Sequence, residues 1–454
     1  MLALSLGSCS GQSSHSFLYQ WLKADEKTLA NQGIVPGLYQ GFGMQTTAGS
    51  GRHLNPPKAK ILKVTTLKPF GPGSYYQALK AEGPRTIVFE VSGAIKYPEQ
   101  STVVINSDYL TVAGQTAPGK GVAIYGLQHV VRANHVLFEH LRFRAGDMGT
   151  AKKVNKKGWT QFSEWDCFKI GGDYIVFKNC TFSWATDELV QTTGNHISFY
   201  RCLFMEGLNS PKHHKGQHSK GLILFNQSGY DGDSLAVIQN IFLSCQDRNP
   251  QLGGPIGVVI VNNFIANAKF GIGVVHSPKG GPKATITHNV MQNVWKNPLR
   301  YVPRPAHTRG QVYFGPHLIY GTLIESPWTY GQKPIFLREA PGWEGKPGYN
   351  RAEEPPLNLV NYTMLSVQDL KPFLEDKVGA FPKQRDASEL RLFSTVWKNG
   401  EGAIPKSVEE AGGWPQLPEL QVKLDVPSKP FELAANGYTH LENFLTMHRL
   451  SVEQ

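Results

Sequence analysis

The stretch that decides the fold runs from Trp165 to Gln292, where one short pattern occurs five times. The copies read Tyr174-Ile-Val-Phe-Lys-Asn-Cys-Thr-Phe182, His196-Ile-Ser-Phe-Tyr-Arg-Cys-Leu-Phe204, Ala236-Val-Ile-Gln-Asn-Ile-Phe242, Val259-Ile-Val-Asn-Asn-Phe-Ile265 and Ala284-Thr-Ile-Thr-His-Asn-Val290. Aligned on the markers Asn179, Arg201, Asn240, Asn263 and Asn289, they are 22, 39, 23 and 26 residues apart. A repeat of about 22 residues, enlarged in places by an inserted loop, is typical of stacked β-solenoid coils.

The pattern inside each copy supports the same interpretation. Apolar and polar residues alternate before the marker, as in a strand with one buried face. Four of the five markers are Asn, which tolerates turn geometry and can hydrogen-bond to the next Asn in a stack. The residue after each marker is apolar, which we interpret as an inward-facing stack. A doubly wound α/β fold needs a long helix between strands, and 22 residues leave no room for one. We therefore predict an all-β parallel β-helix.

Composition limits the partners of the protein. The chain has 454 residues, a net charge of +11 and a pI near 9.2, which favours a polyanionic partner over an uncharged one. The sequence contains no Lys/Arg-rich run interleaved with aromatics of the kind that indicates nucleic-acid binding. An acidic polysaccharide is therefore the preferred partner, and a basic surface without a special partner is the alternative. Among the five cysteines, Cys180 and Cys202 occupy equivalent positions in adjacent coils, where apolar stacking is favoured over a disulfide.

The chain divides into three parts. Residues 1–36 resemble a signal remnant and linker, because Leu6-Gly-Ser-Cys9 matches the end of a bacterial lipoprotein signal, with Cys9 as the lipidated residue. Residues 37–356 form the β-helix, with a short helix around Ala78 and Leu79 capping its open end. Residues 357–454 read as an irregular tail with short helices, packed on the coil. We expect a secreted or cell-envelope monomer that meets a membrane only through Cys9.

Several further strings share one family pattern. They are Gly71-Pro-Gly-Ser74, Gly83-Pro-Arg-Thr-Ile-Val-Phe-Glu-Val-Ser-Gly93, Ala113-Gly-Gln-Thr-Ala-Pro-Gly119, Leu141-Arg-Phe-Arg144, Phe182-Ser-Trp-Ala-Thr-Asp-Glu188, Lys215-Gly216, Arg248-Asn-Pro250, Val378-Gly-Ala380, Arg385-Asp386, Gly412-Gly-Trp-Pro415 and Gly437-Tyr-Thr439. Together they resemble the bacterial pectate lyases of polysaccharide lyase family 1, from about residue 40 to the end. The resemblance implies a right-handed β-helix, Ca²⁺, and β-elimination of a uronic-acid polymer.

Elimination from a polyuronate poses a physical problem, because the proton next to the carboxylate is a very weak acid. A hard cation shared between protein and substrate carboxylates can neutralise the developing charge, and Ca²⁺ prefers such oxygen ligands. A base must then take the proton. The resemblance assigns that base to an arginine, here Arg248. Free arginine is always protonated, so this role follows from the family and not from the residue itself. The alternative for Arg248 is a simple ion pair with Asp247.

Three carboxylates are candidates for the metal. Asp166 precedes one strand, and Asp187-Glu188 begins the equivalent strand one coil later. The 22-residue step from Asp166 leads to Glu188 and would stack the two about 4.8 Å apart. The family motif instead aligns Asp187. Because successive strand residues face opposite sides, only one of the pair should face the metal. Solvated carboxylates at a turn are the alternative for all three.

Other residues complete the expected site. Lys215 matches the substrate-binding lysine of the family. Arg142, Arg144 and Arg201 either line the groove or make structural salt bridges, and we take Arg144 and Arg201 as substrate-binding candidates. The neighbouring His213, His214 and His218 could suggest zinc, but no cysteine pairing supports it, so satisfied loop histidines are favoured.

Two departures weaken the match. Gly253 stands where the family often has a second arginine, and Gln191 stands where a later acidic ligand is expected. They weaken the expected metal site and leave open either pectate, the preferred substrate, or another uronate polymer. We also keep two alternatives to the Ca²⁺-assisted polyuronate lyase. One is a glycoside hydrolase on the same solenoid, which needs a pair of working carboxylates. The other is a non-catalytic polysaccharide-binding protein.

Overall fold

The computed structural model describes residues 42–44, 46–148, 164–210, 213, 215–225, 232–302, 310–327, 337–338, 351–359, 362 and 364–453. The expected signal remnant and linker over 1–36, including Cys9, lies outside the described residues, as does His214. No helix within the described ranges is long and apolar enough to cross a membrane.

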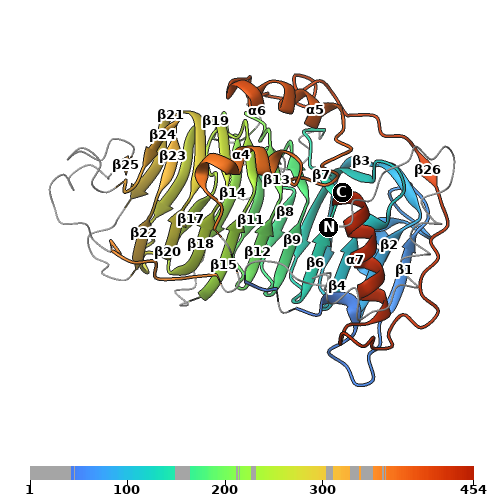
Figure 1. Cartoon of the computed structure of the whole chain (residues 1–454). Coiled ribbons are helices and arrows are strands. Elements are labelled where there is room, and N and C mark those ends of the chain that lie inside the picture. The colour runs from blue at the N-terminus through green and yellow to red at the C-terminus, as the bar shows by residue number, and fades with distance from the viewer. Residues whose placement is uncertain are drawn as a thin grey trace, which may run out of the picture.

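Ten parallel strands form the first sheet, each from a successive stretch of the chain (Figure 1). In spatial order they are β1 (Lys60–Val64), β2 (Arg85–Phe89), β4 (Leu110–Ala113), β6 (Val136–Glu139), β9 (Ile175–Lys178), β12 (Ile197–Tyr200), β15 (Gly232–Ile238), β18 (Ile256–Val261), β20 (Lys283–Thr287) and β22 (Gln311–Phe314). From β2 onward, the chain passes through the second sheet between each neighbouring pair. This topology confirms the parallel β-helix.

The second sheet supplies the other two walls of the coil. We call one wall the tail arm, and it consists of β7 (Arg142–Arg144), β10 (Thr181–Ser183), β13 (Leu203–Met205) and β16 (Ile241–Leu243). We call the other the site arm, and it consists of β8 (Phe168–Ile170), β11 (Glu188–Thr192), β14 (Lys220–Phe225) and β17 (Gln251–Gly253). Longer strands run through both walls, namely β3 (Val91–Ile105), β5 (Val122–Val131), β19 (Phe264–Val275) and β21 (Asn289–Val302). At the far end lie β23 (His317–Ile319), β24 (Thr322–Ile324) and β25 (Leu337–Arg338).

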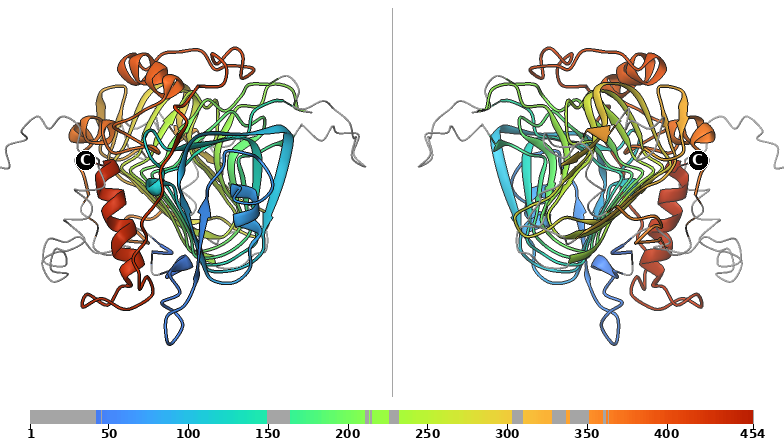
Figure 2. Two further views of the ribbon diagram at one scale, coloured as in Figure 1. Left: turned by 90° about the vertical axis from the view of Figure 1, so that its right-hand side faces the viewer. Right: turned by 90° about the vertical axis from the view of Figure 1, so that its left-hand side faces the viewer.

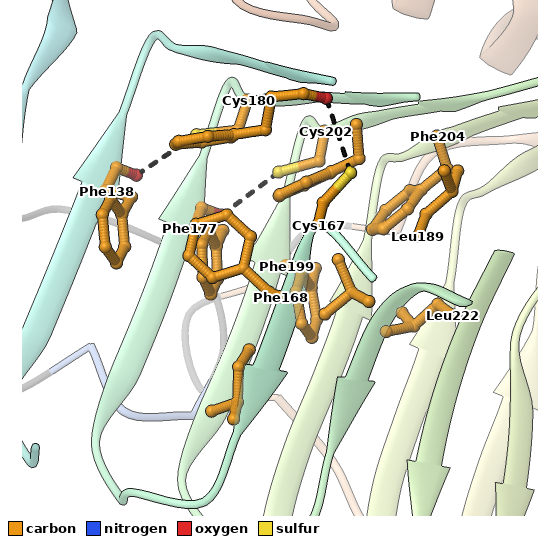
Figure 3. Packing of buried hydrophobic residues seen from close by; sticks show 14 of the residues in the cluster. Phe138, Cys167, Phe168, Phe177, Cys180, Leu189, Phe199, Cys202, Phe204 and Leu222 are labelled. Atoms are coloured by element: carbon orange, nitrogen blue, oxygen red, sulfur yellow. Dashed lines mark hydrogen bonds between the residues drawn. The ribbon is translucent and has the colours of Figure 1, made fainter. Parts of the chain in front are cut away.

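Stacked aromatic side chains fill the interior of the coil. Phe138, Phe177 and Phe199 lie one above another, with neighbouring ring centroids 5.1 and 5.3 Å apart (Figure 3). Burying one such ring stabilises the fold by about 1.5–3 kcal/mol. Cys180 and Cys202 are buried beside this row as free thiols, which confirms packing over a disulfide.

The asparagine stack exists, but its alignment differs from the expected one by a residue. Asn240, Asn263 and Asn289 are in register, and each amide is hydrogen-bonded to the next, at 3.0 and 2.9 Å. The coil before them contributes Cys202, whose backbone N–H donates to Asn240 Oδ1 at 2.7 Å, and not Arg201. Cys180 and Cys202 therefore share the Asn position. The true step here is 38 residues, and the 39-residue step was wrong.

The confusion has a physical cause. Asn179, Arg201 and Asn262 all have positive φ, between 48° and 54°, and occupy the turn position just before the inward-facing one. Asparagine suits both positions, because it tolerates the left-handed region and its amide can hydrogen-bond along a stack. The residue after the inward asparagine faces outward: Ile241, Phe264 and Val290 pack under the C-terminal tail.

The N-terminal end and the sides of the coil carry helices. The short helix α3 (Tyr75–Lys80) buries Ala78 and Leu79 at the N-terminal opening, as expected, and lies across that opening in the left view of Figure 2. The described chain also forms 3₁₀ turns over Ala48–Ser50 and Gly114–Thr116. The tail contributes α4 (Val367–Glu375), α5 (Ala387–Ser394), α6 (Val396–Asn399), β26 (Leu420–Gln421) and α7 (His440–Glu453).

The tail packs on the outside of the coil through apolar contacts. Leu370 of α4 and Trp397 of α6 belong to one cluster with Met205 and Leu243 of the tail arm. Leu441 and Phe444 of α7 pack against outward side chains of β2 and β4, and α7 runs beside these strands in Figure 1. The tail therefore covers apolar surface that a bare coil would expose to water.

Candidate active site

Three of the expected site residues stand just before a strand of the site arm, and a fourth lies in the loop before another of these strands. Asp166 precedes β8, Asp187 precedes β11, and Arg248 precedes β17, while Lys215 lies in the loop before β14. Because the strands of the site arm are paired in parallel, the same point of each coil comes to one edge of the sheet. The repeat therefore brings together residues that are up to 82 positions apart in sequence.

The three carboxylates form one cluster. An oxygen from each of Asp166, Asp187 and Glu188 lies within 4.8 Å of the others. Asp166 Oδ1 accepts the backbone N–H of Glu188 at 3.1 Å, and the fully buried Oδ2 atom has no hydrogen-bond partner. The expectation that only one of Asp187 and Glu188 would face this point is not met. Both do, because Asp187 lies in the turn and is not bound by strand alternation.

The pKa values of two carboxylates in the cluster are shifted in opposite directions. Burial raises the pKa of Asp166 well above its usual value, because the charged form loses its hydration. Burial also acts on the pKa of Asp187, but its contact with His218 and the nearby charges outweigh it and lower that pKa. Asp187 is thus held ionised, whereas Asp166 gains the most from a cation.

Arg248 faces the carboxylates and not its sequence neighbour. Its guanidinium is ion-paired with Glu188, and the two side chains are 20% and 5% exposed. Asp247 instead accepts the backbone N–H of Arg248 at 2.8 Å and pairs with Lys220 at 3.1 Å. The backbone of Arg248 has a φ of 65°, a conformation that residues other than glycine adopt rarely and often at functional sites. Burial lowers the pKa of Arg248 against the opposing effect of Asp187 and Asp166.

Two of the three histidines also reach the cluster. His213 and His218 stack at 3.9 Å, and their Nε2 atoms lie 3.7 and 2.8 Å from Asp187 Oδ1. The spacing alone would suit a metal ion. However, His213 Nδ1 accepts the backbone N–H of Lys215 at 3.1 Å, so a neutral ring carries its proton on Nε2. That nitrogen then has no lone pair for a metal, which supports the interpretation of satisfied loop histidines.

Two expected substrate-binding residues do not reach this site. Arg144 is fully buried in the tail arm, where it donates to Asp386 Oδ2 at 2.6 Å, so the expectation that it contacts substrate is wrong. Arg142 is likewise buried against Glu389. Arg201 stacks near Phe373 of α4 and donates to Gln239 at 2.9 Å. It lies under the tail and does not line the groove either.

Sequence reasoning missed Lys169 and Lys220. Lys169 Nζ is 3.5 Å from Asp166 Oδ2. Lys220 stands in register with Glu188 on the next coil, which the sequence could have revealed only with the correct length of the loop between them. At the two departures, Gln191 lies in register with Lys169, and Gly253 lies against the ring of Phe225.

The donor set fits a hard cation in part. Asp166 and Asp187 offer oxygen atoms, which Ca²⁺ prefers. The Oδ2 atom of Asp166 is buried, makes no hydrogen bond and lies 3.5 Å from Lys169 Nζ, so it can still serve as a ligand atom. Glu188 is already engaged by Arg248, and Gln191 adds no charge. The residues present therefore suit a cation held by two protein carboxylates and completed by an anionic substrate.

Curated proteins similar to this chain share one name. A protein named probable pectate lyase C from Aspergillus terreus is 26% identical over 430 residues, covering 89% of this chain and 91% of its own. One of the same name from Neosartorya fischeri is 27% identical over 440 residues, with the same coverage. No family model matches the chain.

Solved structures share the fold. A pectate lyase variant from Bacillus subtilis superposes with a TM-score of 0.53 at 14% identity, covering 77% of this chain and 98% of its own. A pectate lyase bound to a hexasaccharide gives 0.52 at 14% identity, covering 78% and 99%. The resemblance to pectate lyases that the sequence strings indicated is thereby confirmed.

Proposed function

We propose that this protein is a polysaccharide lyase that cleaves pectate by β-elimination, with Arg248 as the base and a cation held at Asp166 and Asp187. One observation carries the assignment of residues. A partly exposed guanidinium meets three clustered carboxylates at one edge of a coil that is similar to pectate lyases. We also propose Lys215, Arg248 and the acidic cluster as the polymer-binding surface of an extracellular or cell-envelope monomer.

Arg248 is suited to receive a proton for two reasons. Burial lowers its pKa, and Glu188 holds the guanidinium at a fixed place beside the acidic cluster. A substrate carboxylate would compete with Glu188 for the guanidinium, which would free a nitrogen to face the substrate. Ca²⁺, when bound by Asp166 and Asp187, would draw charge from the substrate carboxylate and make the neighbouring proton more acidic.

Lys215 provides a second positive contact. Its side chain is exposed, and its backbone N–H binds His213, which in turn contacts Asp187. The loop thus ties an exposed ammonium to the acidic cluster. An ammonium in this position would pair with a uronate carboxylate of the polymer.

The geometry speaks against an inverting hydrolase. Inverting enzymes keep their two carboxyl groups roughly 6.5–9.5 Å apart to admit water. Here the three groups approach within 4.8 Å, and one of them is engaged by Arg248. A non-catalytic binding protein would use the same surface, and only the release of product separates it from a lyase.

The experiment is turnover of polygalacturonate, followed by the ultraviolet absorbance of the unsaturated product. We expect Arg248→Ala to lower kcat at least about 100-fold, because a general base typically contributes that much. Arg351→Ala, beside β22 of the first sheet, removes an arginine whose partner Glu353 is exposed and serves as the control. Reducing ends without absorbance would indicate a hydrolase, and full activity of Arg248→Ala would remove Arg248 from the role.

Removal of the cation gives an independent prediction. A chelator should abolish turnover. Excess Ca²⁺ should raise the melting temperature, because at 100 times its Kd it adds about 2.7 kcal/mol to the free energy of unfolding. Asp166→Asn should lose this stabilisation, because it removes one of the two proposed carboxylate ligands. Equal stabilisation of both proteins by Ca²⁺ would contradict Asp166 as a ligand.

A further inference from the structure

A second group of cations lies on the same edge of the coil, beyond Arg248. The backbone N–H groups of Lys269 and Phe270 bind the carbonyl of Gln246, one coil before them. Phe270 is in register with Asn297 on the following coil, next to Lys296. This group therefore continues the row of residues that carries Asp166, Glu188 and Arg248, one to two coils further along the axis.

Three positive side chains surround one aromatic ring there. Lys269 Nζ and Lys296 Nζ each lie 5.6 Å from the centroid of Phe270, and Arg300 Cζ lies 4.9 Å from it. Arg300 is held in place by Gln251, which accepts a hydrogen bond from its Nη2 at 2.5 Å. Gly273 leaves room beside this guanidinium, since a Cβ atom there would approach Nη2 to 3.4 Å. We call these four residues the Phe270 cluster: Lys269, Phe270, Lys296 and Arg300.

Within the described part of the chain, only Arg300 of this cluster has a carboxylate within ion-pair distance. Among the described residues, no carboxylate lies within ion-pair distance of Lys269 or Lys296. The carboxylate of Asp247 is 3.9 Å from Arg300 but is closer to Lys220, at 3.1 Å. Cation–π contacts offset only part of the repulsion between like charges. Such a cluster is stabilised by binding an anion.

We propose that the Phe270 cluster is a second carboxylate-binding subsite, which holds a uronate residue of the same polymer whose neighbouring unit is positioned at Arg248. The two places are roughly 5–10 Å apart along the axis, from the spacing of one or two strands. This is a few sugar units or fewer, so one extended chain reaches both. The inference rests on the proposed function for the identity of the polymer.

The position of the cluster, on the same edge of the coil as the acidic cluster, favours a polyuronate over a nucleic acid. The cluster lies in line with the acidic cation site, and a ligand that spans both must bridge carboxylates through a cation and then meet ammonium groups. A polymer with one carboxylate on each sugar does both. Arg300 also supplies a guanidinium where Gly253 cannot.

The test compares the double variant with the wild type on polygalacturonate and on short oligogalacturonates. Lys269→Gln/Lys296→Gln should raise KM for long polygalacturonate about fivefold or more and leave kcat within about twofold, since neither residue touches the reacting unit. The KM for digalacturonate or trigalacturonate should rise as well, because the cluster holds the neighbour of the unit at Arg248 and even a short chain spans both places. The dependence of KM on salt should weaken for the polymer. The control is Lys398→Gln/Lys423→Gln, which removes two exposed charges from the tail.

A binding measurement separates this inference from the proposed function. If the wild type shows no lyase activity, the proposed function fails, and hexagalacturonate titrations of wild type and variant still test the subsite. Reduced affinity of the variant supports the subsite. An unchanged KM for polymer or an unchanged affinity for the hexamer overturns it. The subsite is also overturned if the variant loses affinity for an oligonucleotide but not for the hexamer. The single variant Lys296→Gln, at an exposed position, repeats the test should the double variant fold poorly.

Discussion

His129 is a histidine enclosed by aromatic side chains in the core of the coil. Its Nε2 lies 3.2 Å from the hydroxyl of Tyr75, and its Nδ1 lies 3.3 Å from the carbonyl of Cys167. The ring stacks on Phe168 at 4.4 Å. The carbonyl can only accept, so the proton is on Nδ1 and the ring is neutral. Burial lowers the pKa of His129 to about 3, because a charged ring would lose its hydration.

This residue makes stability depend on pH in a defined direction. Below about pH 6.5 an unfolded chain binds a proton at His129, whereas the folded protein does not until about pH 3. As the pH falls through this window, the free energy of unfolding should therefore decrease by about 1.4 kcal/mol for each pH unit because of His129 alone. We measure the free energy of unfolding of His129→Gln in urea between pH 6 and 4. Its dependence on pH should be less steep than that of the wild type by about one proton. His317, whose pKa is also lowered to about 3 by burial, should behave alike. Equal slopes for wild type and both variants would contradict this account.

At the scale of elements, the asparagine stack joins neighbouring coils at their inner corner. The side chain of Asn263 accepts from the backbone and amide of Asn240, and donates to Asn289 and to the carbonyls of Val237 and Val261. It is fully buried, so water cannot replace these bonds. The stack thus fixes the register between β15, β18 and β20.

Removing one member of the stack should be costly. Asn263→Ala leaves several buried polar groups without partners, each costing about 1–3 kcal/mol, so we expect a total loss of roughly 3 kcal/mol or more. The measurement is the free energy of unfolding in urea. Asn293→Ala removes a half-buried side chain whose amide donates to the carbonyl of Gly400, and should cost about 1 kcal/mol. Similar losses for the two variants would argue against a special role for the stack.

For the whole molecule, the tail is fastened to the coil by a buried ionic cluster. Asp386, the N-cap of α5, forms an ion pair with Arg144 at 2.6 Å, and Glu389 forms one with Arg142 at 3.1 Å. All four side chains are fully buried. Although burial opposes it, the charge of Arg144 and Arg142 lowers the pKa of Asp386, which keeps the carboxylate ionised. The same two acids form the capping box of α5, so the cluster positions the helix as well as the charges.

Breaking this cluster should affect stability and not substrate binding. We expect Asp386→Ala to lower the free energy of unfolding by about 3–5 kcal/mol, because it leaves Arg144 buried without its partner. Asp376→Ala, which breaks an exposed pair with Lys383, should cost at most about 1 kcal/mol. The KM for pectate, measured well below the melting temperature, should not change. A raised KM with unchanged stability would restore Arg144 to the groove.

The order of residues along the chain determined the coil and much of the site. Alternation and the repeat length specify stacked parallel strands, because a short repeat leaves room only for strands and turns. The same repeat places Asp166, Asp187 and Arg248 before equivalent strands, so their meeting follows from sequence arithmetic. The outward apolar residues of the tail helices likewise indicated that the tail packs on the coil.

Only the tertiary structure decided which of two similar residues does what. Arg144 and Arg248 both lie at strands of the coil. Arg144, however, is bound by Asp386 of the tail, 242 positions away in sequence. Neighbouring turn and inward positions both accept asparagine, so the local pattern could not fix a one-residue register. The Phe270 cluster joins side chains from two coils and belongs to no motif. In each case the deciding contact comes from a part of the chain distant in sequence, and local preferences carry no information about it.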